Sequence, residues 1–211
     1  MSSVDSVLDE EVFVMPPMSM ATIEQIATAL LQEIAPNSLV SPGKLRLLEV
    51  CETQLESRGV FVYPASDEEL NGRAGATDPT GAPGDPISIL LRSEDFDALG
   101  VGGPGENFAR STLAHELAHA ILHVPRIRRI RALRLERILL SRMRRAELKP
   151  YLDPEWQAFA LGGCILAPRE AISLLPGTAL AELARVFGTS ESLMWMHLKR
   201  LRLLPKEEGY R

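Results

Sequence analysis

Apolar residues recur at helical spacing along much of the chain, so the sequence predicts a mostly helical protein. Residues 20–34 (MATIEQIATALLQEI) carry an apolar helical stripe behind Ser19, a typical N-cap residue. Residues 41–59 predict a second helix that ends at Gly59. The remaining predicted helices are one that includes 110–123 and ends at Pro125, then 126–149 ended by Pro150, 153–168 with Asp153 as N-cap, 178–187, and 190–203.

Two short runs of branched and aromatic residues predict strands at 59–65 (GVFVYPA) and 87–92 (ISILLR). Between them, 71–86 is too rich in Gly and Pro for regular structure beyond a turn or a short strand. The glycine-rich stretch 99–105 is expected to be a connector that leads into the helix containing 110–123.

These elements together predict an α+β fold with many helices and a small β-sheet. We expect an irregular leader over 1–19, a main domain over 20–176, and a C-terminal helical portion over 177–211 packed on the same domain. The two C-terminal helices flank the sequence GTS and superficially resemble a helix-turn-helix. Direct DNA binding by this pair is not favoured.

Composition narrows the class of protein. The chain has 211 residues, of which 45% are hydrophobic and 24% charged, and its acidic N-terminus is unlike a signal peptide. No stretch is apolar enough to cross a membrane, so we expect a cytoplasmic protein without a membrane partner. Cys51 and Cys164 lack metal-type spacing and are expected to be buried thiols.

Positive charge is concentrated in one segment. Residues 126–145 hold nine Arg and a single Glu, whereas the whole chain carries a net charge of −5. An amphipathic helix with a solvated cationic face explains this segment most simply. A docking face for an acidic protein is the second interpretation, and a nucleic-acid site, which normally needs basic charge over a whole face, is the third.

The stretch RSTLAHELAHAILH (110–123) places charged and titratable groups in an otherwise apolar helix. His115 and His119 are four residues apart and point the same way, and Glu116 lies between them. An unpaired buried carboxylate or imidazole costs several kcal/mol. A divalent ion bound by both histidines removes this cost, and HExxH is the pattern in which two His bind zinc while the Glu acts as general base for hydrolysis.

His123 extends the series by one turn but does not fit a third-ligand position, because the glycine turn of the longer metzincin motif is absent. We interpret it as a helix-end cation or as a residue that supports the ligands. The remaining candidates for a third ligand are His197, Glu136, Glu147, Asp153, Glu155, Glu170 and Glu182. Glu155 begins a helix that contains Gly162 and Gly163, which suggests close packing against the Ala114 and Ala118 surface of the histidine helix.

At this point the chain resembles the ImmA/IrrE family of metallopeptidases. The family pattern R-F-T-x-A-H-E-x-x-H-x-x-L-H is matched by 110–123, and its D-P-E-W-Q-A segment is matched by DPEWQAFALGGCILAP (153–168). The stretches GVFVYPASDEELNGRAGATDPT, ISILLR and LARVFGTSESLMWMHLKRL also look like family segments. The resemblance covers most of 20–204 and implies a zincin-like metallopeptidase domain, with Glu155 as the third zinc ligand. It also implies that the two C-terminal helices belong to the same fold, which is why direct DNA binding is not favoured.

The sequence departs from the family pattern in three places. Phe159 replaces an Asn or Asp that is expected to hydrogen-bond near the ligands, Leu161 and Gly162 replace Phe-Ala, and His197 replaces an Arg. A lost polar group around a metal site can lower affinity or activity about 10- to 100-fold. The ligand residues themselves are retained.

The first functional hypothesis is therefore a zinc endopeptidase in which Glu116 is the base and His115, His119 and Glu155 hold the metal. Manganese or iron are further options for such a site. Tyr151 and His123 are both candidates for an additional transition-state donor. The resemblance implies a helix-turn-helix repressor as the protein substrate, whose cleavage releases stress or mobile-element genes. The second hypothesis is a metal-retaining regulatory protein that binds a partner protein or DNA without cutting it.

Overall fold

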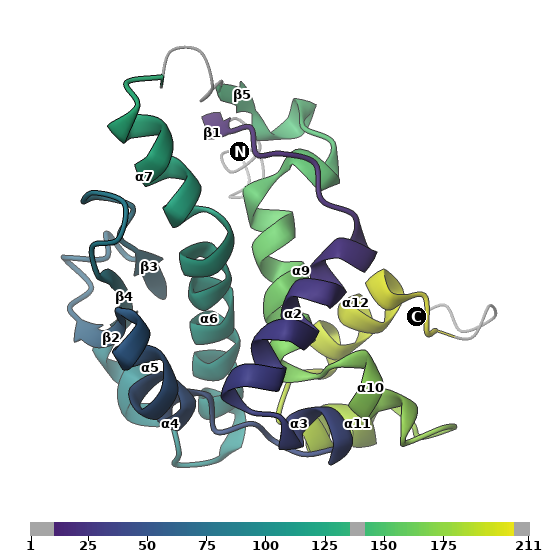
Figure 1. Cartoon of the computed structure of the whole chain (residues 1–211). Helices are drawn as coiled ribbons and strands as arrows, with labels where there is room; N and C mark the ends of the chain where they lie inside the picture. The colour runs from purple at the N-terminus through teal and green to yellow at the C-terminus, as the bar shows by residue number, and fades with distance from the viewer. Residues whose placement is uncertain (1–10, 136–141, 205–211) are drawn as a thin grey trace, which may run out of the picture.

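The computed structural model describes residues 11–135 and 142–204 and has an α+β fold that is mostly helical (Figure 1). The helices are α2 (Met20–Ile34), α3 (Asn37–Val40), α4 (Leu47–Val50), α5 (Ser93–Ala98), α6 (Gly103–Leu122), α7 (Val124–Ala132), α9 (Pro154–Leu166), α10 (Arg169–Ser173), α11 (Leu180–Phe187) and α12 (Glu191–Leu201). The strands are β1 (Glu11–Phe13), β2 (Val60–Ala65), β3 (Gly75–Thr77), β4 (Ile87–Arg92) and β5 (Arg142–Arg144).

Helix α6 occupies the middle of the molecule. The sheet formed by β2, β3 and β4 lies on one side of it, and α9 and α2 lie on the other (Figure 1). The apolar residues of α6, α9, α2 and β4 form one buried cluster, and burying them removes their apolar surface from water. Fully buried members include Ile23, Leu31, Ile89, Leu91, Leu113, Leu117, Leu161 and Ile165.

The small sheet has the strand order β2-β4-β3. β2 and β4 pair in parallel, with Val60 opposite Ile87, as expected for two strands joined by a long connection. β3 pairs antiparallel with β4 and lies beside α6. The strands predicted at 59–65 and 87–92 are confirmed, and the glycine-rich stretch between them supplies the short edge strand β3.

Two adjacent glycines allow α9 to pack closely against two neighbouring helices, α6 and α12. A Cβ added at Gly162 would lie 3.1 Å from the backbone C and O atoms of Ala114. A Cβ at Gly163 would lie 2.5 Å from Nδ1 of His197, which is fully buried on α12. The close packing expected against the Ala114 surface is therefore confirmed for Gly162, whereas Gly163 packs against α12 instead.

Several predicted helix ends are confirmed. The Ser19 side chain accepts a hydrogen bond from Thr22 N at 3.1 Å, and Asp153 caps α9 by accepting from Glu155 N at 3.0 Å. The predicted second helix begins at Leu47 rather than at 41; α4 continues through a π-helix (Cys51–Leu55) and a 3₁₀ turn (Glu56–Arg58). Gly59 ends it with a φ of 78°, which a glycine adopts easily.

The arginine-rich segment does not form the long helix predicted over 126–149. Helix α6 ends at Leu122, and Pro125 then lies in the first turn of α7, which ends at Ala132. Arg134 has a φ of 54°, outside the helical region. Residues 136–141 lie outside the described residues, and β5 and two 3₁₀ turns (Arg145–Glu147 and Pro150–Leu152) follow.

Two other segments also differ from expectation. The leader predicted to be irregular contains β1, which pairs antiparallel with β5, so that Val12 lies opposite Met143; residues 1–10 lie outside the described residues. The glycine-rich connector is shorter than expected, because α6 already begins at Gly103. The pairing of β1 with β5 therefore connects the N-terminal part of the described chain to the segment between α7 and α9.

Both cysteines are buried thiols, as expected. Burial raises the pKa of Cys51 and of Cys164 to about 12, so neither is a thiolate at neutral pH. Among the described residues, no helix combines the length and apolar character needed to cross a membrane.

Candidate metal centre

Helices α6 and α9 bring together the three residues predicted as metal ligands. His115 and His119 lie one turn apart on the same face of α6, and their side chains are 13% and 18% exposed. Glu155 lies in the first turn of α9, where the capping carboxylate of Asp153 holds its backbone N–H. Because α9 packs along α6, the Glu155 carboxylate faces both imidazoles.

The three side chains converge through specific atoms. The two Nε2 atoms are 3.1 Å apart, and Glu155 Oε2 lies 3.1 Å from His115 Nε2 while Oε1 lies 3.3 Å from His119 Nε2. Tetrahedral zinc with bonds of about 2.0–2.1 Å separates its ligand atoms by about 3.3 Å. The spacing and the donor types therefore fit a zinc ion with a His₂Glu ligand set.

Charge in the site is balanced between Glu155 and the histidines. Burial raises the pKa of Glu155, but hydrogen bonds from His115 and His119 outweigh burial and hold this pKa well below its usual range. For His119, burial lowers the pKa, and the hydrogen bond and charge of Glu155 outweigh it and raise the pKa above 6.5. Glu155 therefore stays ionised and available as a ligand.

The Nδ1 side of the His119 ring contacts a chain of buried polar groups, His123 and Gln157. Its Nδ1 lies 2.9 Å from Nδ1 of His123, and His123 Nε2 lies 3.0 Å from Oε1 of Gln157. The Gln157 amide nitrogen in turn donates to the backbone carbonyls of Pro16 and Tyr151, at 2.9 Å each. His123 and Gln157 are 2% and 0% exposed, so water does not replace these contacts.

This chain determines which nitrogens carry protons. Because the Gln157 nitrogen donates twice, its oxygen accepts, and His123 must donate from Nε2. Burial, and then the charge of His119, lower the pKa of His123 to about 4, so His123 is neutral and its Nδ1 accepts. His119 must then donate from Nδ1, which leaves the lone pair of its Nε2 directed at the ligand cluster in the neutral form. His123 is a supporting neighbour and not a helix-end cation.

His115 has no comparable support. Its Nδ1 is buried and makes no hydrogen bond to any described residue. The ring of Phe159, on the next turn of α9 after Glu155, lies against the imidazole with a centroid distance of 4.2 Å. Phe159, where the resemblance leads us to expect Asn or Asp, therefore lies beside the candidate ligand whose Nδ1 has no hydrogen bond to a described residue.

Glu116 faces β3 from the same turn of α6. Thr77 Oγ1 lies 2.7 Å from Glu116 Oε2 and 2.9 Å from the Glu116 carbonyl oxygen, so one hydroxyl proton is shared between them. A Cβ added at Gly75 would lie 3.0 Å from Glu116 Cγ, so only glycine allows β3 to approach this closely. One carboxylate oxygen is thereby fixed by β3.

The outer side of β3 is an edge beside the ligands. Asp78 N donates to Ser88 O, and Arg92 N donates to Ala74 O, on the side that faces β4. The alternation of an antiparallel ladder then directs the N–H and C=O groups of Gly75 and Thr77 away from β4. No other described strand pairs with β3.

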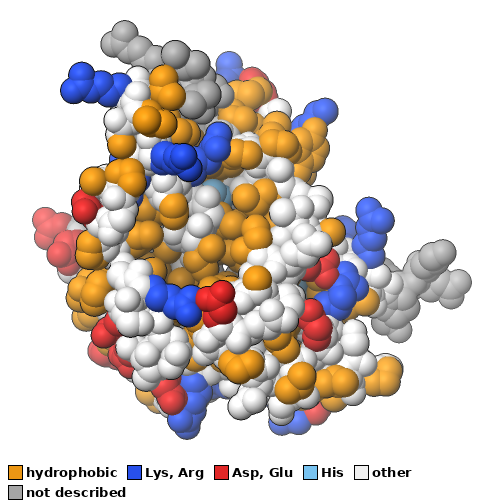
Figure 2. All heavy atoms as spheres, in the orientation of Figure 1, with side chains coloured by type: hydrophobic (Ala, Val, Ile, Leu, Met, Phe, Trp, Pro, Cys, Tyr) orange, Lys and Arg blue, Asp and Glu red, His pale blue; other side chains and the backbone are white. Residues whose placement is uncertain are grey.

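A cavity of about 470 Å³ opens onto these groups. It is lined by His115, Glu116, His119, His123 and Glu155, by Arg73, Gly75, Ala76, Thr77 and Pro79 around β3, by Phe13, Met15, Arg142 and Arg145 around the β1–β5 pair, and by Val124, Ile127 and Pro154. The face in Figure 2 is hollow at its centre, where hydrophobic side chains surround a visible histidine with Lys or Arg side chains directly above it.

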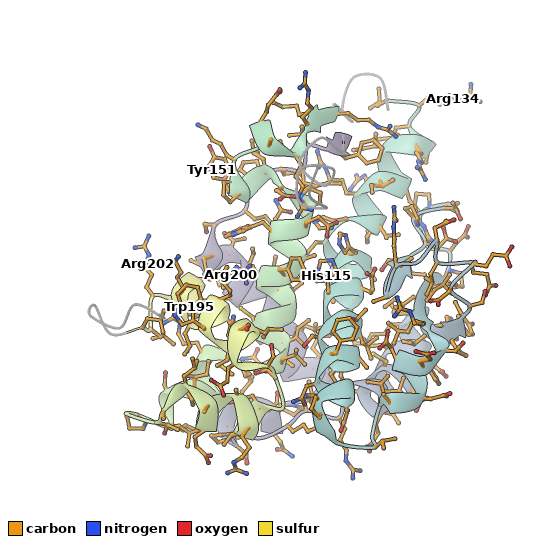
Figure 3. All side chains as sticks on the ribbon, turned by 180° about the vertical axis from the view of Figure 1, so that it is seen from behind. His115, Arg134, Tyr151, Trp195, Arg200 and Arg202 are labelled. Atoms are coloured by element: carbon orange, nitrogen blue, oxygen red, sulfur yellow. The ribbon has the colours of Figure 1, made fainter. Side chains whose placement is uncertain are left out.

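Tyr151, predicted as a candidate donor, does not line this cavity. Its side chain is 41% exposed, and Lys149 Nζ lies over its ring at 6.0 Å from the centroid. In Figure 3 it lies at the periphery, with α9 between it and His115. Tyr151 contributes to the site through its backbone carbonyl, which accepts a hydrogen bond from Gln157, and not through its phenol.

The remaining third-ligand candidates lie elsewhere or serve other roles. His197 is fully buried and its Nε2 contacts the Ala167 carbonyl at 2.8 Å, while Glu136 lies outside the described residues. Sequence reasoning missed Thr77 and Gln157. Gln157 follows Glu155 by two residues in the quoted EWQA segment, whereas nothing in the pattern around Thr77 indicates its contact with Glu116.

Comparison of the chain with protein-family models, with curated proteins and with solved structures finds no match.

Proposed function

We propose that the protein is a zinc-dependent endopeptidase with a zincin-like catalytic domain. The observation that carries the proposal is the convergence of His115, His119 and Glu155. The two Nε2 atoms are 3.1 Å apart, and the two carboxylate oxygens of Glu155 lie 3.1 Å from His115 Nε2 and 3.3 Å from His119 Nε2, with Glu116 lining the same cavity. Three protein ligands and an open fourth position are typical of catalytic zinc.

Zinc bound by these residues would supply Lewis-acid chemistry, activating water and polarising a peptide carbonyl. Glu116 accepts the proton of the attacking water and returns it to the nitrogen of the departing amine. Thr77 holds Glu116 Oε2 at 2.7 Å, so Oε1 is the oxygen left to exchange the proton.

The edge of β3 provides a binding surface for the substrate. An extended peptide segment can hydrogen-bond to the outward N–H and C=O groups of Gly75 and Thr77, and this recognition needs no particular side chains. The segment would then lie in the cavity that Glu116 and the two histidines line. Manganese or iron in the same ligands would leave this arrangement of the chain's own groups unchanged.

The resemblance of 110–123 and 153–168 to ImmA/IrrE metallopeptidases supports a helix-turn-helix repressor as the substrate. Cleavage of such a repressor would release stress or mobile-element genes. The proposed setting is the cytoplasm, where such repressors act.

A second candidate function is a regulatory protein that keeps the metal and binds a partner protein or DNA without cutting it. The observation that favours it is the unsupported His115 Nδ1 beside Phe159, since a weakened ligand can retain structure while activity is lost.

The two candidates are separated by Glu116→Gln. Zinc-loaded wild-type protein is incubated with a library of proteome-derived peptides, and the products are identified by mass spectrometry. We expect cleavage by the wild type and a loss of at least about 1,000-fold in Glu116→Gln, because the base is removed while the zinc content stays the same. The exposed Glu68→Gln is the matched control. A zinc-loaded wild type that binds peptides without cutting any would overturn the peptidase in favour of the second candidate.

A further inference from the structure

Arginines from three separate segments meet at the candidate metal cavity. Arg73 precedes β3, Arg142 lies in β5, and Arg145 lies in the 3₁₀ turn that follows β5. The cavity is the one that holds the HExxH residues, and the chain around it carries a net charge of −5. The cavity is therefore lined by three positively charged side chains, although the net charge of the whole chain is negative.

Two of these arginines have no counter-ion among the described residues. Arg145 Nε pairs with Asp153 Oδ2 at 3.3 Å. The Arg142 guanidinium lies 4.6 Å from the Phe13 ring centroid, and neither Arg142 nor Arg73 forms an ion pair with any described residue. A cation held over an aromatic ring keeps its hydrogen-bond donors available for an anion.

Other arginines of the molecule are used differently. Arg128 is 3% exposed and donates to the carbonyls of Asp85 and Pro86, and Arg131 donates to the carbonyl of Pro79. They anchor the loop that follows β3. Arg128 and Arg131 are therefore structural, whereas Arg73 and Arg142 line the cavity.

The carboxylates inside the cavity do not neutralise Arg73 or Arg142. Glu155 is directed at the two histidines, and Glu116 is held by Thr77. A segment lying along β3 passes Arg73 on the strand side, with Arg142 on the β5 side of the same cavity. Both arginines line the same cavity as Glu116 and the two histidines, so side chains that flank the cleaved bond of an extended segment would enter the space that they line.

We infer that Arg73 and Arg142 select substrate segments that carry Asp or Glu within about three residues of the cleaved bond. This inference rests on the proposed peptidase function and specifies its substrate class. Each guanidinium presents several donors in a planar fork that matches a carboxylate. A peptide is favoured over nucleic acid because two arginines in a concave cavity do not form the extended basic face that a phosphate backbone requires.

The test compares cleavage preferences of zinc-loaded variants on a proteome-derived peptide library. We expect Asp and Glu to be enriched near the cleaved bond by the wild type. Arg73→Glu and Arg142→Glu should each lower cleavage of acidic peptides roughly fivefold or more and increase the share of basic ones. Arg142→Lys should keep much of the preference. Arg126→Glu, an exposed arginine of α7 that does not line the cavity, is the matched control and should change nothing.

A second measurement separates this inference from the peptidase proposal. The zinc-loaded Glu116→Gln protein is immobilised, and the peptides that it retains from the same library are identified. Retention of acidic peptides that depends on Arg73 and Arg142 supports the inference even if the wild type cuts nothing. Cleavage or retention without an acidic preference would overturn it. Preferential retention of a single-stranded oligonucleotide through the same arginines would also contradict it.

Discussion

The two histidines of the HExxH stretch belong to one helix face but have different surroundings. His119 is connected through Nδ1 to His123 and Gln157, and that chain ends on two backbone carbonyls. The Nδ1 of His115 is buried without a partner beside Phe159. A metal site therefore needs more than its ligands, since the groups behind each imidazole set its tautomer and orientation.

The largest change in zinc affinity is expected from Gln157→Leu, which acts on the His119 side of the site. The substitution leaves His123 Nε2 unpaired and removes the reason for the His119 tautomer, so zinc affinity should fall about 10- to 100-fold. Zinc affinity is measured by competition with a chromogenic chelator. Phe159→Leu is the matched control on the His115 side: it removes no hydrogen bond and should change the affinity by less than about threefold. Equal losses in both variants would show that the chain behind His119 has no special role.

A smaller effect is expected from pH. His119 has a raised pKa, so its protonated form persists above pH 6.5, and zinc must displace that proton. Apparent zinc affinity should therefore fall as pH decreases through that raised pKa, approaching tenfold per unit once a single proton is displaced. Glu155 adds little in this range, because its pKa is lowered and it remains ionised.

The same pKa values can be checked by NMR titration of the metal-free protein. His119 should titrate above 6.5, and His123, one helical turn away, near the pKa of about 4 that burial gives it. In Glu155→Gln the His119 midpoint should move down, since the carboxylate that raises it is gone. A His123 that titrates with His119 in the neutral range would contradict the assigned proton positions.

The smallest effect is expected from Phe159→Asn. An amide oxygen at this position can accept a hydrogen bond from His115 Nδ1, whose ring now contacts Phe159. Zinc affinity should increase about three- to tenfold, because the His115 imidazole gains a hydrogen-bond partner at Nδ1, which His119 already has in His123. The same competition assay measures it, and an unchanged affinity would show that the orphaned Nδ1 carries no cost.

Much of the ligand arrangement could be predicted from the sequence because it depends on local rules. Helical spacing places His115 and His119 on one face, the Asp153 cap fixes the start of α9, and Gly162 predicts the close approach of α9 to α6. The resemblance named Glu155 among several acids. The structure places its carboxylate beside the histidines. Metal binding, the identity of the metal and the reaction stay predictions.

The arginine-rich segment shows where local pattern fails. Its apolar residues continue at helical spacing, yet α7 ends at Ala132 and Leu133 is 58% exposed. Arg128 instead donates hydrogen bonds to the backbone carbonyls of Asp85 and Pro86, more than 40 positions earlier in the chain. The pairing of β1 with β5 is likewise a contact between distant segments, and such contacts outweigh local propensity.

Contacts between distant segments also explain why the roles of Thr77 and Gln157 were not predicted from the sequence. Thr77 reaches Glu116 from a three-residue strand, and Gln157 reaches His123 from 34 positions away. Neither contact leaves a periodic signal. The supporting groups of the site are thus less predictable than its ligands.

The most direct test of the central claim is the metal content of the protein purified without chelators. Elemental mass spectrometry is applied to the wild type and to Glu155→Ala in the same run. The account predicts about one zinc per wild-type chain and clearly less in the variant, since three converging ligands are needed. A wild type that is empty and refuses added zinc, or a Glu155→Ala variant that stays fully loaded, would contradict it.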